Sequence, residues 1–247
     1  MKVKKILKYL IGLVFYNFFF RYVKPLGNRV LIYHAFGSKL AHDSYGISID
    51  LNLFEEHLVF LKKNYVVLPI SDNTFSNELG LNSVSISIDD GYKDNLLAVK
   101  LLEKYQLPYT IYIATGFVGN EQYLTQADLE NLSRSIFCTL GAHSINHVYL
   151  SKIDEDKQYE ELYNSKIFLE NIIGKEVKDF SYPYGDYDAS SKNIAESLYG
   201  LISTSHIGIN SVNQNRKMIK RIEIVASDDV VSLKKKIDGY YDFLGYL

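Results

Sequence analysis

The sequence predicts an α/β fold, a single distorted (β/α) barrel of about seven strands. Apolar runs with strand character alternate with helical segments after residue 27, an order typical of a largely parallel sheet with helices outside it. The length of 247 residues, with 47% hydrophobic and 23% charged side chains, suits one large α/β domain. No repeat, low-complexity tract or linker interrupts residues 28–247. We therefore expect one domain over 28–247, preceded by a separate segment over 1–27.

The expected strands are short apolar runs rich in β-branched and aromatic residues. The run 84–88 shows the alternation of a strand, and Cys138, the only cysteine, lies in the run 136–140. We expect Cys138 to be a buried, small apolar residue, and a lone cysteine cannot form an internal disulfide. The remaining strands are expected over residues 29–33, 65–70, 109–113, 177–182, 201–204 and 219–225.

Capping residues predict where the helices begin, and glycines predict where they end. Asp50 or Asn52 is expected to cap a helix whose apolar stripe is Phe54, Leu58 and Leu61. Further helices are expected over 96–105, capped by Asp94 and Asn95; from Thr125, with Asp128 in capping-box spacing; from Ser151, with Asp154 in the same spacing, to Gly174; over 188–199, closed by Gly200; and after residue 225.

The N-terminal segment is first basic and then apolar. A run of twelve apolar and aromatic residues, 9–20, is shorter than the ~20 residues that a spanning helix needs, and no small-x-small cleavage site follows it. Residues 1–27 are therefore a candidate membrane anchor, uncleaved or lying in the interface through residues 2–24, on either side of the membrane of the cell envelope. A helix packed on the domain is the alternative. The basic residues that flank the run are Lys2, Lys4, Lys5, Lys8, Arg21 and Lys24.

The charge balance does not indicate a nucleic-acid partner. Lysine plus arginine (27) against aspartate plus glutamate (29) gives a net charge of −2, whereas nucleic-acid binding usually requires a basic patch. The 21 tyrosines and 13 phenylalanines could line a sugar site, although such residues more often lie at the rim of a core. The composition thus permits a neutral carbohydrate substrate without identifying one.

Two adjacent carboxylates, Asp89 and Asp90, follow the strand 84–88 directly. Such neighbours repel each other and lose hydration unless a positive group lies beside them. Adjacent side chains at a strand end can point in different directions, so one can bind a metal ion while the other faces a substrate. A surface Asp-Gly turn, formed with Gly91, is the alternative.

His143 and His147 lie four residues apart after the run 136–140. In a helical turn this spacing puts both imidazoles on one side, where they can bind one cation. Two unrelated surface histidines are the alternative. A carboxylate with two imidazoles leaves coordination positions open, as catalytic metal sites do. We expect one divalent metal ion, with Zn²⁺ as first choice and Co²⁺, Ni²⁺ or Mn²⁺ also compatible with nitrogen and oxygen ligands.

A third polar segment, Tyr182-Pro183-Tyr184-Gly185, follows the strand 177–182. The proline between two tyrosines is expected to form a rigid wall of a substrate-binding pocket, with Tyr182 and Pro183 in contact with the substrate. The backbone N–H of Tyr184 would be free to point into that pocket. A plain strand-to-loop turn is the alternative.

Asp-Asp-Gly, His-x-x-x-His and Tyr-Pro-Tyr-Gly, in this order, resemble the polysaccharide deacetylase family, the fourth family of carbohydrate esterases. The likeness runs from about Val30 to Val225, and the joint pattern is far more specific than any single motif. It implies the deacetylase type of (β/α) barrel over 28–247 and a metal-dependent hydrolase. The implied roles are metal ligands for Asp90, His143 and His147, general base for Asp89, and oxyanion donor for the N–H of Tyr184.

A general acid must also protonate the departing amine. Many family members take it from a histidine after a Leu-rich strand near the C-terminus, but no such strand follows the last histidine here, His206. The run ending in His34 resembles instead a circularly permuted branch that includes deacetylases of poly-N-acetylglucosamine. His34 is therefore our candidate acid, with a histidine that merely caps the first strand as the alternative. His42, His57 and His206 are interpreted as ordinary surface or packing residues.

One departure from the family pattern concerns the base. The arginine that usually precedes the Pro-Tyr segment, where it orients the base, is replaced by Ser181 and Tyr182. Arg221 is our candidate for the base-orienting residue, and a solvated charge at a strand end is the alternative. A smaller departure is Ile88, which stands where an aromatic residue usually precedes Asp-Asp-Gly.

The expected activity is removal of N-acetyl groups from a glycan or glycan precursor of the N-acetylhexosamine type. The same site could instead hydrolyse O-acetyl esters or a small amide or imide. The missing arginine is the only feature that favours a third alternative, an inactive glycan-binding relative. The expected partner is an N-acetylated carbohydrate, and the sequence does not predict an oligomeric state.

Overall fold

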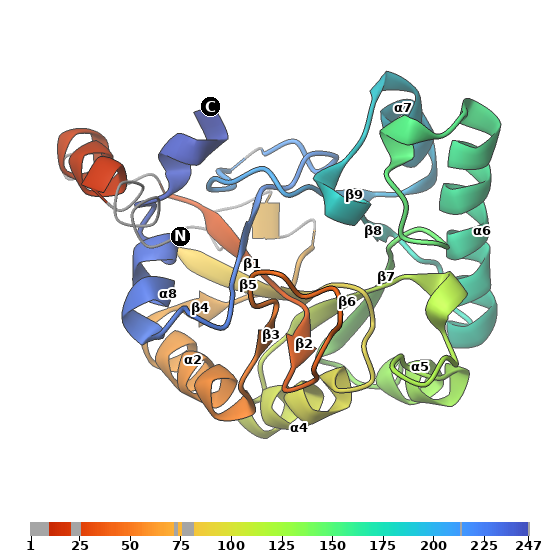
Figure 1. Cartoon of the computed structure of the whole chain (residues 1–247), viewed down its shortest axis with the longest axis horizontal. Coiled ribbons are helices and arrows are strands. Elements are labelled where there is room, and N and C mark those ends of the chain that lie inside the picture. Colours follow the sequence, from red (N-terminus) through yellow and green to blue (C-terminus); the bar gives the residue numbers. More distant parts are fainter. Residues whose placement is uncertain (1–9, 21–25, 72–73, 76–81, 213, 247) are drawn as a thin grey trace.

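The computed structural model describes residues 10–20, 26–71, 74–75, 82–212 and 214–246. Its main sheet consists of parallel strands in the order β10-β1-β5-β6-β7-β8-β9, curled nearly closed into a barrel with helices around it (Figure 1). This is the nearly closed, parallel (β/α) barrel that the sequence predicts. The strands are β1 (Asn28–Tyr33), β5 (Ser83–Ile88), β6 (Tyr109–Ile113), β7 (Cys138–Ala142), β8 (Asp179–Ser181), β9 (Leu201–Ser203) and β10 (Arg221–Glu223).

Three further strands are short. β4 (Val66–Val67) pairs with β5 outside the main path of the sheet. β2 (Ala35–Phe36) and β3 (Ser48–Ile49) form a separate two-stranded parallel sheet just after β1.

The main chain before β10 bridges the two edge strands of the barrel. Ile219 pairs with Ser203 of β9, and the Thr204 N–H donates to the Ile219 carbonyl at 2.8 Å. β10 then pairs with β1. The barrel is therefore nearly closed, and the carboxyl ends of its strands surround one common mouth.

Helices follow most strands and cover the outside of the sheet (Figure 1). Asp50 caps the first of them by accepting the Asn52 N–H at 2.8 Å. The predicted capping box of Thr125 and Asp128 is confirmed, and so is the left-handed Gly174 at the end of the longest helix. The helices are α2 (Leu51–Asn64), α4 (Asn95–Tyr105), α5 (Gln126–Leu132), α6 (Glu155–Ile173), α7 (Ala189–Leu198) and α8 (Val230–Ile237), with short 3₁₀ turns at Thr115–Phe117, Leu150–Lys152, Pro183–Gly185 and Asp242–Tyr246.

β5 is buried on both faces, and its two faces differ in polarity. Its apolar residues, including Ile86, pack in the main core with the outer helices. Its serines lie on the other face, where Ser85 accepts a hydrogen bond from Asn28 at 3.0 Å and Ser87 contacts Arg221 at 3.0 Å. The inside of the barrel is therefore partly polar, and it can hold charged side chains below the mouth.

Several predicted boundaries of strands are wrong. The strand expected over 65–70 is reduced to β4, since Pro69 has no N–H with which to continue a ladder. β7 starts at Cys138, because Ile136 is 90% exposed and lies before the sheet. Cys138 was expected to be buried, but it is only partly buried. The strands expected over 177–182 and 219–225 are shorter, as β8 and β10.

Two predicted helix ends are also wrong. Asp154, not Ser151, caps α6, because the Asp154 carboxylate accepts the Lys157 N–H at 3.0 Å while Ser151 belongs to a separate 3₁₀ turn. The helix α7 is closed by Tyr199, one residue before Gly200.

Residues 10–20 of the N-terminal segment are helical and end in a π-helical turn, Tyr16–Phe20. Tyr16 stacks on Tyr240 with ring centroids 4.0 Å apart, and Phe15 lies 6.1 Å from Phe243. This part of the segment therefore packs on the C-terminal residues of the domain. No helix among the described residues is long and apolar enough to cross a membrane. The predicted basic flank, residues 2–8 and 21–24, lies outside the described residues.

Candidate active site

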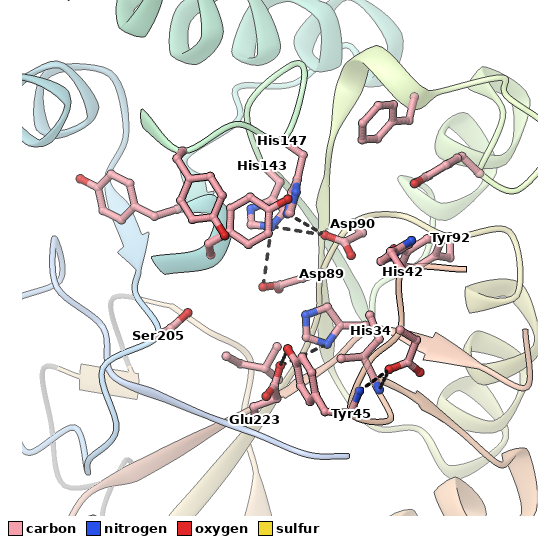
Figure 2. Close-up of a pocket in the computed structure, with 18 of the residues that line it drawn as sticks. His34, His42, Tyr45, Asp89, Asp90, Tyr92, His143, His147, Ser205 and Glu223 are labelled. Atoms are coloured by element: carbon pink, nitrogen blue, oxygen red, sulfur yellow. Dashed lines mark hydrogen bonds and ion pairs between the residues drawn. The ribbon is translucent and has the colours of Figure 1, made fainter. Parts of the chain in front are cut away.

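A pocket of about 780 Å³ lies at the carboxyl ends of the barrel strands (Figure 2). His34 follows β1, Asp89 and Asp90 follow β5, and His143 follows β7. Glu223, the last residue of β10, also lines this pocket. The strand ends of a nearly closed parallel barrel meet at one rim, so residues distant in the sequence converge there.

The three residues predicted to hold a metal ion, Asp90, His143 and His147, lie together. Each offers one ligand atom, and these atoms all lie within 4.8 Å of one another. Asp90 Oδ1 lies 3.5 Å from His143 Nε2 and 3.1 Å from His147 Nε2, yet this buried oxygen makes no hydrogen bond within the described chain. Burial alone would raise the pKa of the Asp90 carboxyl, but the two imidazoles lower that pKa well below its usual range. An ionised oxygen facing two imidazole nitrogens fits a divalent cation.

The other nitrogen of His143 fixes the tautomer of the ring. His143 Nδ1 lies 2.7 Å from the Ser181 carbonyl, which can only accept, so Nδ1 carries the proton. Nε2 is then left with its lone pair on the side of Asp90. A hydrogen bond of this kind is typical of metal-binding histidines, since it holds the ring in one orientation.

The two histidines do not lie on a helical turn, as the spacing had predicted. Residues 143–149 form a loop, in which Ser144 and His147 have left-handed backbones with φ of 59° and 51°. The His147 N–H donates to Ser144 Oγ at 3.1 Å. The imidazoles converge because the loop folds back on itself, which spacing alone could not reveal.

Glu161 of α6 holds this loop, and the sequence reading did not single it out. One carboxylate oxygen of Glu161 accepts the N–H groups of Ile145 and Asn146 at 2.8 and 2.9 Å. The other accepts the side-chain amide of Asn146 at 2.6 Å. Two consecutive loop N–H groups on one buried carboxylate keep His147 next to Asp90.

The adjacent carboxylates point to different partners because the chain turns sharply after Asp89. Asp90 and Gly91 both have left-handed backbones, with φ of 77° and 78°, a conformation that aspartate tolerates better than most residues. Asp89 still follows the strand, since its N–H donates to the Tyr33 carbonyl at 2.9 Å. Both carboxylates are buried, so the alternative of a surface turn is wrong.

Asp89 forms a two-pronged ion pair with Arg221, at 2.8 Å for each nitrogen–oxygen contact. The guanidinium also donates to Ser87 Oγ at 3.0 Å, to Ser181 Oγ at 2.6 Å and to the Thr204 carbonyl at 3.0 Å. Burial would raise the pKa of Asp89, but the charge of Arg221 outweighs it and lowers that pKa. Asp89 is therefore ionised at neutral pH.

Arg221 supplies the guanidinium that is missing before the Pro-Tyr segment. It is 1% exposed, so the alternative of a solvated charge at a strand end is wrong. Ser181 stands where the family usually has arginine, and its small side chain lies against the Arg221 guanidinium. The positive charge next to Asp89 thus comes from β10 instead of β8.

His34 lies in the pocket between Asp89 and Glu223 (Figure 2). Its Nδ1 lies 4.0 Å from Glu223 Oε1, too far for a hydrogen bond, and this buried nitrogen makes no hydrogen bond among the described residues. Glu223 Oε1 instead accepts the Tyr45 hydroxyl at 3.1 Å. His34 thus lines the pocket with no hydrogen bond at Nδ1, and it does not merely cap the first strand.

Asp94 is the N-cap residue of α4, as predicted, but the prediction that the side chains of Asp94 and Asn95 cap this helix is wrong. Asp94 makes no capping hydrogen bond, because its carboxylate accepts the N–H groups of Phe36 and Ser38 at 2.7 and 3.2 Å. Asn95 donates from its side chain to the His34 carbonyl at 2.7 Å. Both residues therefore hold the chain that follows β1 and carries His34.

Tyr182 precedes the 3₁₀ turn Pro183–Gly185, in which Tyr184 has a left-handed backbone, with φ of 58°. The Tyr184 N–H donates to no carbonyl among the described residues. Its half-exposed ring stacks on Tyr149 at 4.1 Å and touches His147 at 4.5 Å between centroids. Tyr182 is buried in the pocket wall, whereas Pro183 is buried and does not line the pocket.

Several pocket residues escaped the sequence reading. His42, interpreted as an ordinary residue, lines the pocket, and its Nε2 lies 2.9 Å from the Tyr92 hydroxyl. Tyr123 stacks on Tyr92 at 5.1 Å, so aromatic rings cover part of the pocket wall. These residues belong to no sequence motif. The turn 43–48, which places Tyr45, is the only part with a local sequence pattern that could have predicted its structure. His57, by contrast, is a buried packing residue as expected, with Nε2 2.8 Å from the Asp228 carbonyl.

The family model for polysaccharide deacetylases matches residues 76–200, half of the chain. This protein therefore belongs to the polysaccharide deacetylase family, hydrolases of the carbohydrate esterase class. The matched range contains Asp89, Asp90, both loop histidines and the Tyr-Pro-Tyr-Gly turn, whereas His34 and Arg221 lie outside it.

The chain is similar to YxkH of Bacillus subtilis (strain 168), a protein named after the same family, with 26% identity over 81% of this chain and 72% of the relative. It is 24% identical to a poly-beta-1,6-N-acetyl-D-glucosamine N-deacetylase of Staphylococcus aureus, over 79% of this chain and 73% of the relative. Among solved structures, the Streptococcus pyogenes deacetylase PplD in complex with acetate has a TM-score of 0.76 and 25% identity, covering 86% of this chain and 99% of that one. BC0361, a polysaccharide deacetylase from Bacillus cereus, has the same TM-score at 24% identity, with 85% and 69% covered, and supports the fold.

Proposed function

We propose that this protein removes N-acetyl groups from a glycan or glycan precursor of the N-acetylhexosamine type, with one divalent metal ion as cofactor. The observation that carries the proposal is the meeting of Asp90, His143 and His147 in the pocket, beside a second carboxylate, Asp89, that Arg221 holds ionised. The relative from Staphylococcus aureus, named for N-deacetylation of poly-N-acetylglucosamine, supports this substrate class.

The proposed metal ligands are Asp90 Oδ1 and the Nε2 atoms of His143 and His147. When bound there, a divalent ion such as Zn²⁺ would lower the pKa of water and polarise the acetyl carbonyl. Co²⁺, Ni²⁺ and Mn²⁺ also accept this mixture of nitrogen and oxygen ligands.

The remaining catalytic roles belong to side chains and to one backbone N–H of the protein. Asp89 takes a proton from the attacking water, and its fork with Arg221 keeps it ionised and aimed at the pocket. The Tyr184 N–H donates to the oxygen that becomes negative in the transition state. His34, which lies between Asp89 and Glu223 (Figure 2), donates a proton to the departing amine. Tyr182, in the pocket wall, and Pro183, behind it, shape the substrate side of the turn.

The test is acetate release from N-acetylglucosamine oligomers by purified protein loaded with each of the four metal ions. We expect turnover with the wild type, and a loss of about a hundredfold or more for Asp89→Asn with unchanged metal content. An unchanged rate in Asp89→Asn would refute the assignment of the base. Activity on O-acetyl esters or a cyclic imide, with none on the oligomers, would contradict the proposed substrate, and bound metal without any turnover would indicate a binding protein.

A further inference from the structure

The outward face of the N-terminal helix is apolar. Leu10, Ile11, Val14 and Phe18 lie on this face, and each is between 45 and 75% exposed. Helices on the surface of a domain normally turn a polar face to solvent, and neighbouring exposed apolar side chains mark an interaction surface. We call these four residues the apolar stripe.

The stripe is not a core face left unpacked, because the opposite face of the same helix packs on the domain. Tyr16 stacks on Tyr240, and Gly12 lies so close to the Tyr240 carbonyl that an added Cβ would meet its oxygen at 2.3 Å. The helix, which lies at the edge of the molecule near the C-terminal segment (Figure 1), therefore packs one face on the domain and leaves its apolar face exposed.

The sequence around the stripe carries only positive charge. Six basic residues lie within residues 1–27, namely Lys2, Lys4, Lys5, Lys8, Arg21 and Lys24, and the first acidic residue of the chain is Asp43. A second copy of the chain would bring an equally positive segment against this one, which opposes self-association through the stripe. An anionic lipid surface offers both an apolar layer for the stripe and negative headgroups for the basic residues.

The helix and the pocket belong to opposite ends of β1. The C-terminal residues that hold the helix are tied to the amino end of β1 by the ion pair of Arg29 with Asp242, at 2.6 Å. The pocket lies beyond the carboxyl end of β1, where His34 follows. Six strand residues at about 3.3 Å each separate the two ends by roughly 20 Å.

We propose that the apolar stripe docks this protein on an anionic membrane surface, with the helix lying in the interface and the pocket held away from the lipid. The helix adds apolar area and the basic residues add electrostatic attraction, a combination typical of interfacial anchors. Since the stripe and the pocket share no residue, hydrolysis of soluble substrates does not depend on docking.

The test is sedimentation of the full-length chain with vesicles of phosphatidylcholine and phosphatidylglycerol, and with vesicles of phosphatidylcholine alone. We expect binding to the anionic vesicles that weakens with added salt, and a loss of at least about tenfold in the double variant Val14→Glu with Phe18→Glu. Ile136→Glu is the matched control, because Ile136 is an equally apolar, 90% exposed residue before β7, and it should bind like the wild type.

A second measurement guards against a variant that fails to fold. The chain contains no tryptophan, so Phe18→Trp introduces a single probe, with Ile136→Trp as control. We expect the emission of Phe18→Trp alone to shift to the blue on anionic vesicles. Equal vesicle binding by the wild type and the stripe variant would overturn the proposal. The proposal would also be overturned if analytical ultracentrifugation showed that the wild type forms a dimer, and if the only property lost by the stripe variant were this dimer.

Discussion

Arg221 and Asp89 are buried side chains that depend on each other, although 132 positions separate them in the sequence. A buried carboxylate without a partner is strongly unfavourable, and a partner that meets both oxygens also fixes its direction. Ser87 and Ser181 accept further hydrogen bonds from the guanidinium, so its position is determined by three strands.

Replacing Arg221 by methionine should leave Asp89 buried and unpaired. We expect the free energy of unfolding to fall by roughly 3–5 kcal/mol and kcat/KM for acetate release to fall at least about tenfold. Arg221→Lys keeps the positive charge but cannot bind both carboxylate oxygens as a guanidinium does. Its free energy of unfolding and its kcat/KM should therefore lie between those of the wild type and Arg221→Met. Urea unfolding and steady-state kinetics measure these effects, and a methionine variant as stable and active as the wild type would exclude the proposed role.

The ion pair also predicts how stability depends on pH. The pKa of Asp89 is lowered by Arg221 below the ordinary value of about 3.9, despite burial. A carboxyl with a lower pKa in the folded than in the unfolded protein stabilises the fold above its unfolded pKa, and this contribution is lost as pH falls through the folded pKa.

The difference in free energy of unfolding between the wild type and Asp89→Asn should therefore be constant above about pH 5 and shrink below about pH 4. Urea unfolding at each pH, with a chelator present to exclude metal binding, gives this difference. A difference that stayed flat to about pH 2 would mean that Asp89 does not titrate as the partner of Arg221.

One substitution can distinguish the proposed role of His34 from that of the proposed metal ligands. His34→Gln should lower kcat/KM for acetate release by roughly a hundredfold to ten-thousandfold, as expected for loss of a general acid, with metal content unchanged. The control is His206→Gln, because His206 lies next to Tyr187, outside the residues that line the pocket. If His34→Gln lost metal together with activity, His34 would belong to the metal site instead.

At the scale of secondary-structure elements, the loop 143–149 and the helix α6 act as one unit. The loop carries two of the proposed ligands, and Glu161 from α6 accepts two of its N–H groups. The left-handed backbones of Ser144 and His147 are unfavourable conformations for residues other than glycine, so such a loop needs an external anchor.

Glu161→Ala should weaken metal binding by about tenfold to a hundredfold, since His147 would no longer be held beside Asp90. Competition with a chelator of known affinity measures the change. Glu160→Ala is the matched control, because Glu160 is the exposed neighbour on the same helix and should retain the affinity of the wild type. Equal affinities in both variants would show that the loop holds its shape without Glu161.

At the scale of the whole molecule, the proposed metal ion would connect the chain after β5 with the loop after β7. A ligand that binds only the folded state raises its stability, by about 2.7 kcal/mol at a hundredfold excess over Kd. We expect added Zn²⁺ to raise the Tm of chelator-treated protein, and no rise in the double variant Asp90→Asn with His147→Asn. A wild-type Tm that did not respond to any of the four metal ions would contradict a metal site.

The sequence by itself determined the barrel and most of the residues around its mouth. Alternating strand and helix patterns are local, so β1, β5 and β6 and the caps Asp50 and Thr125 could be predicted closely. The proposed metal ligands could be identified because they occur in short motifs directly after strands. The strand expected over 65–70 failed at Pro69, which has no N–H with which to continue the ladder.

Only the tertiary structure decided how the site is held together. Arg221 reaches Asp89, Glu161 anchors the histidine loop, and Asp94 holds the chain around His34. Each contact joins residues at least 15 positions apart, the shortest separation being that of Asn146 and Glu161. No local spacing carries that information, because such contacts arise only when the barrel brings separate strand ends to one rim. Local periodicity specifies elements, whereas the partners of a buried charge depend on how those elements pack.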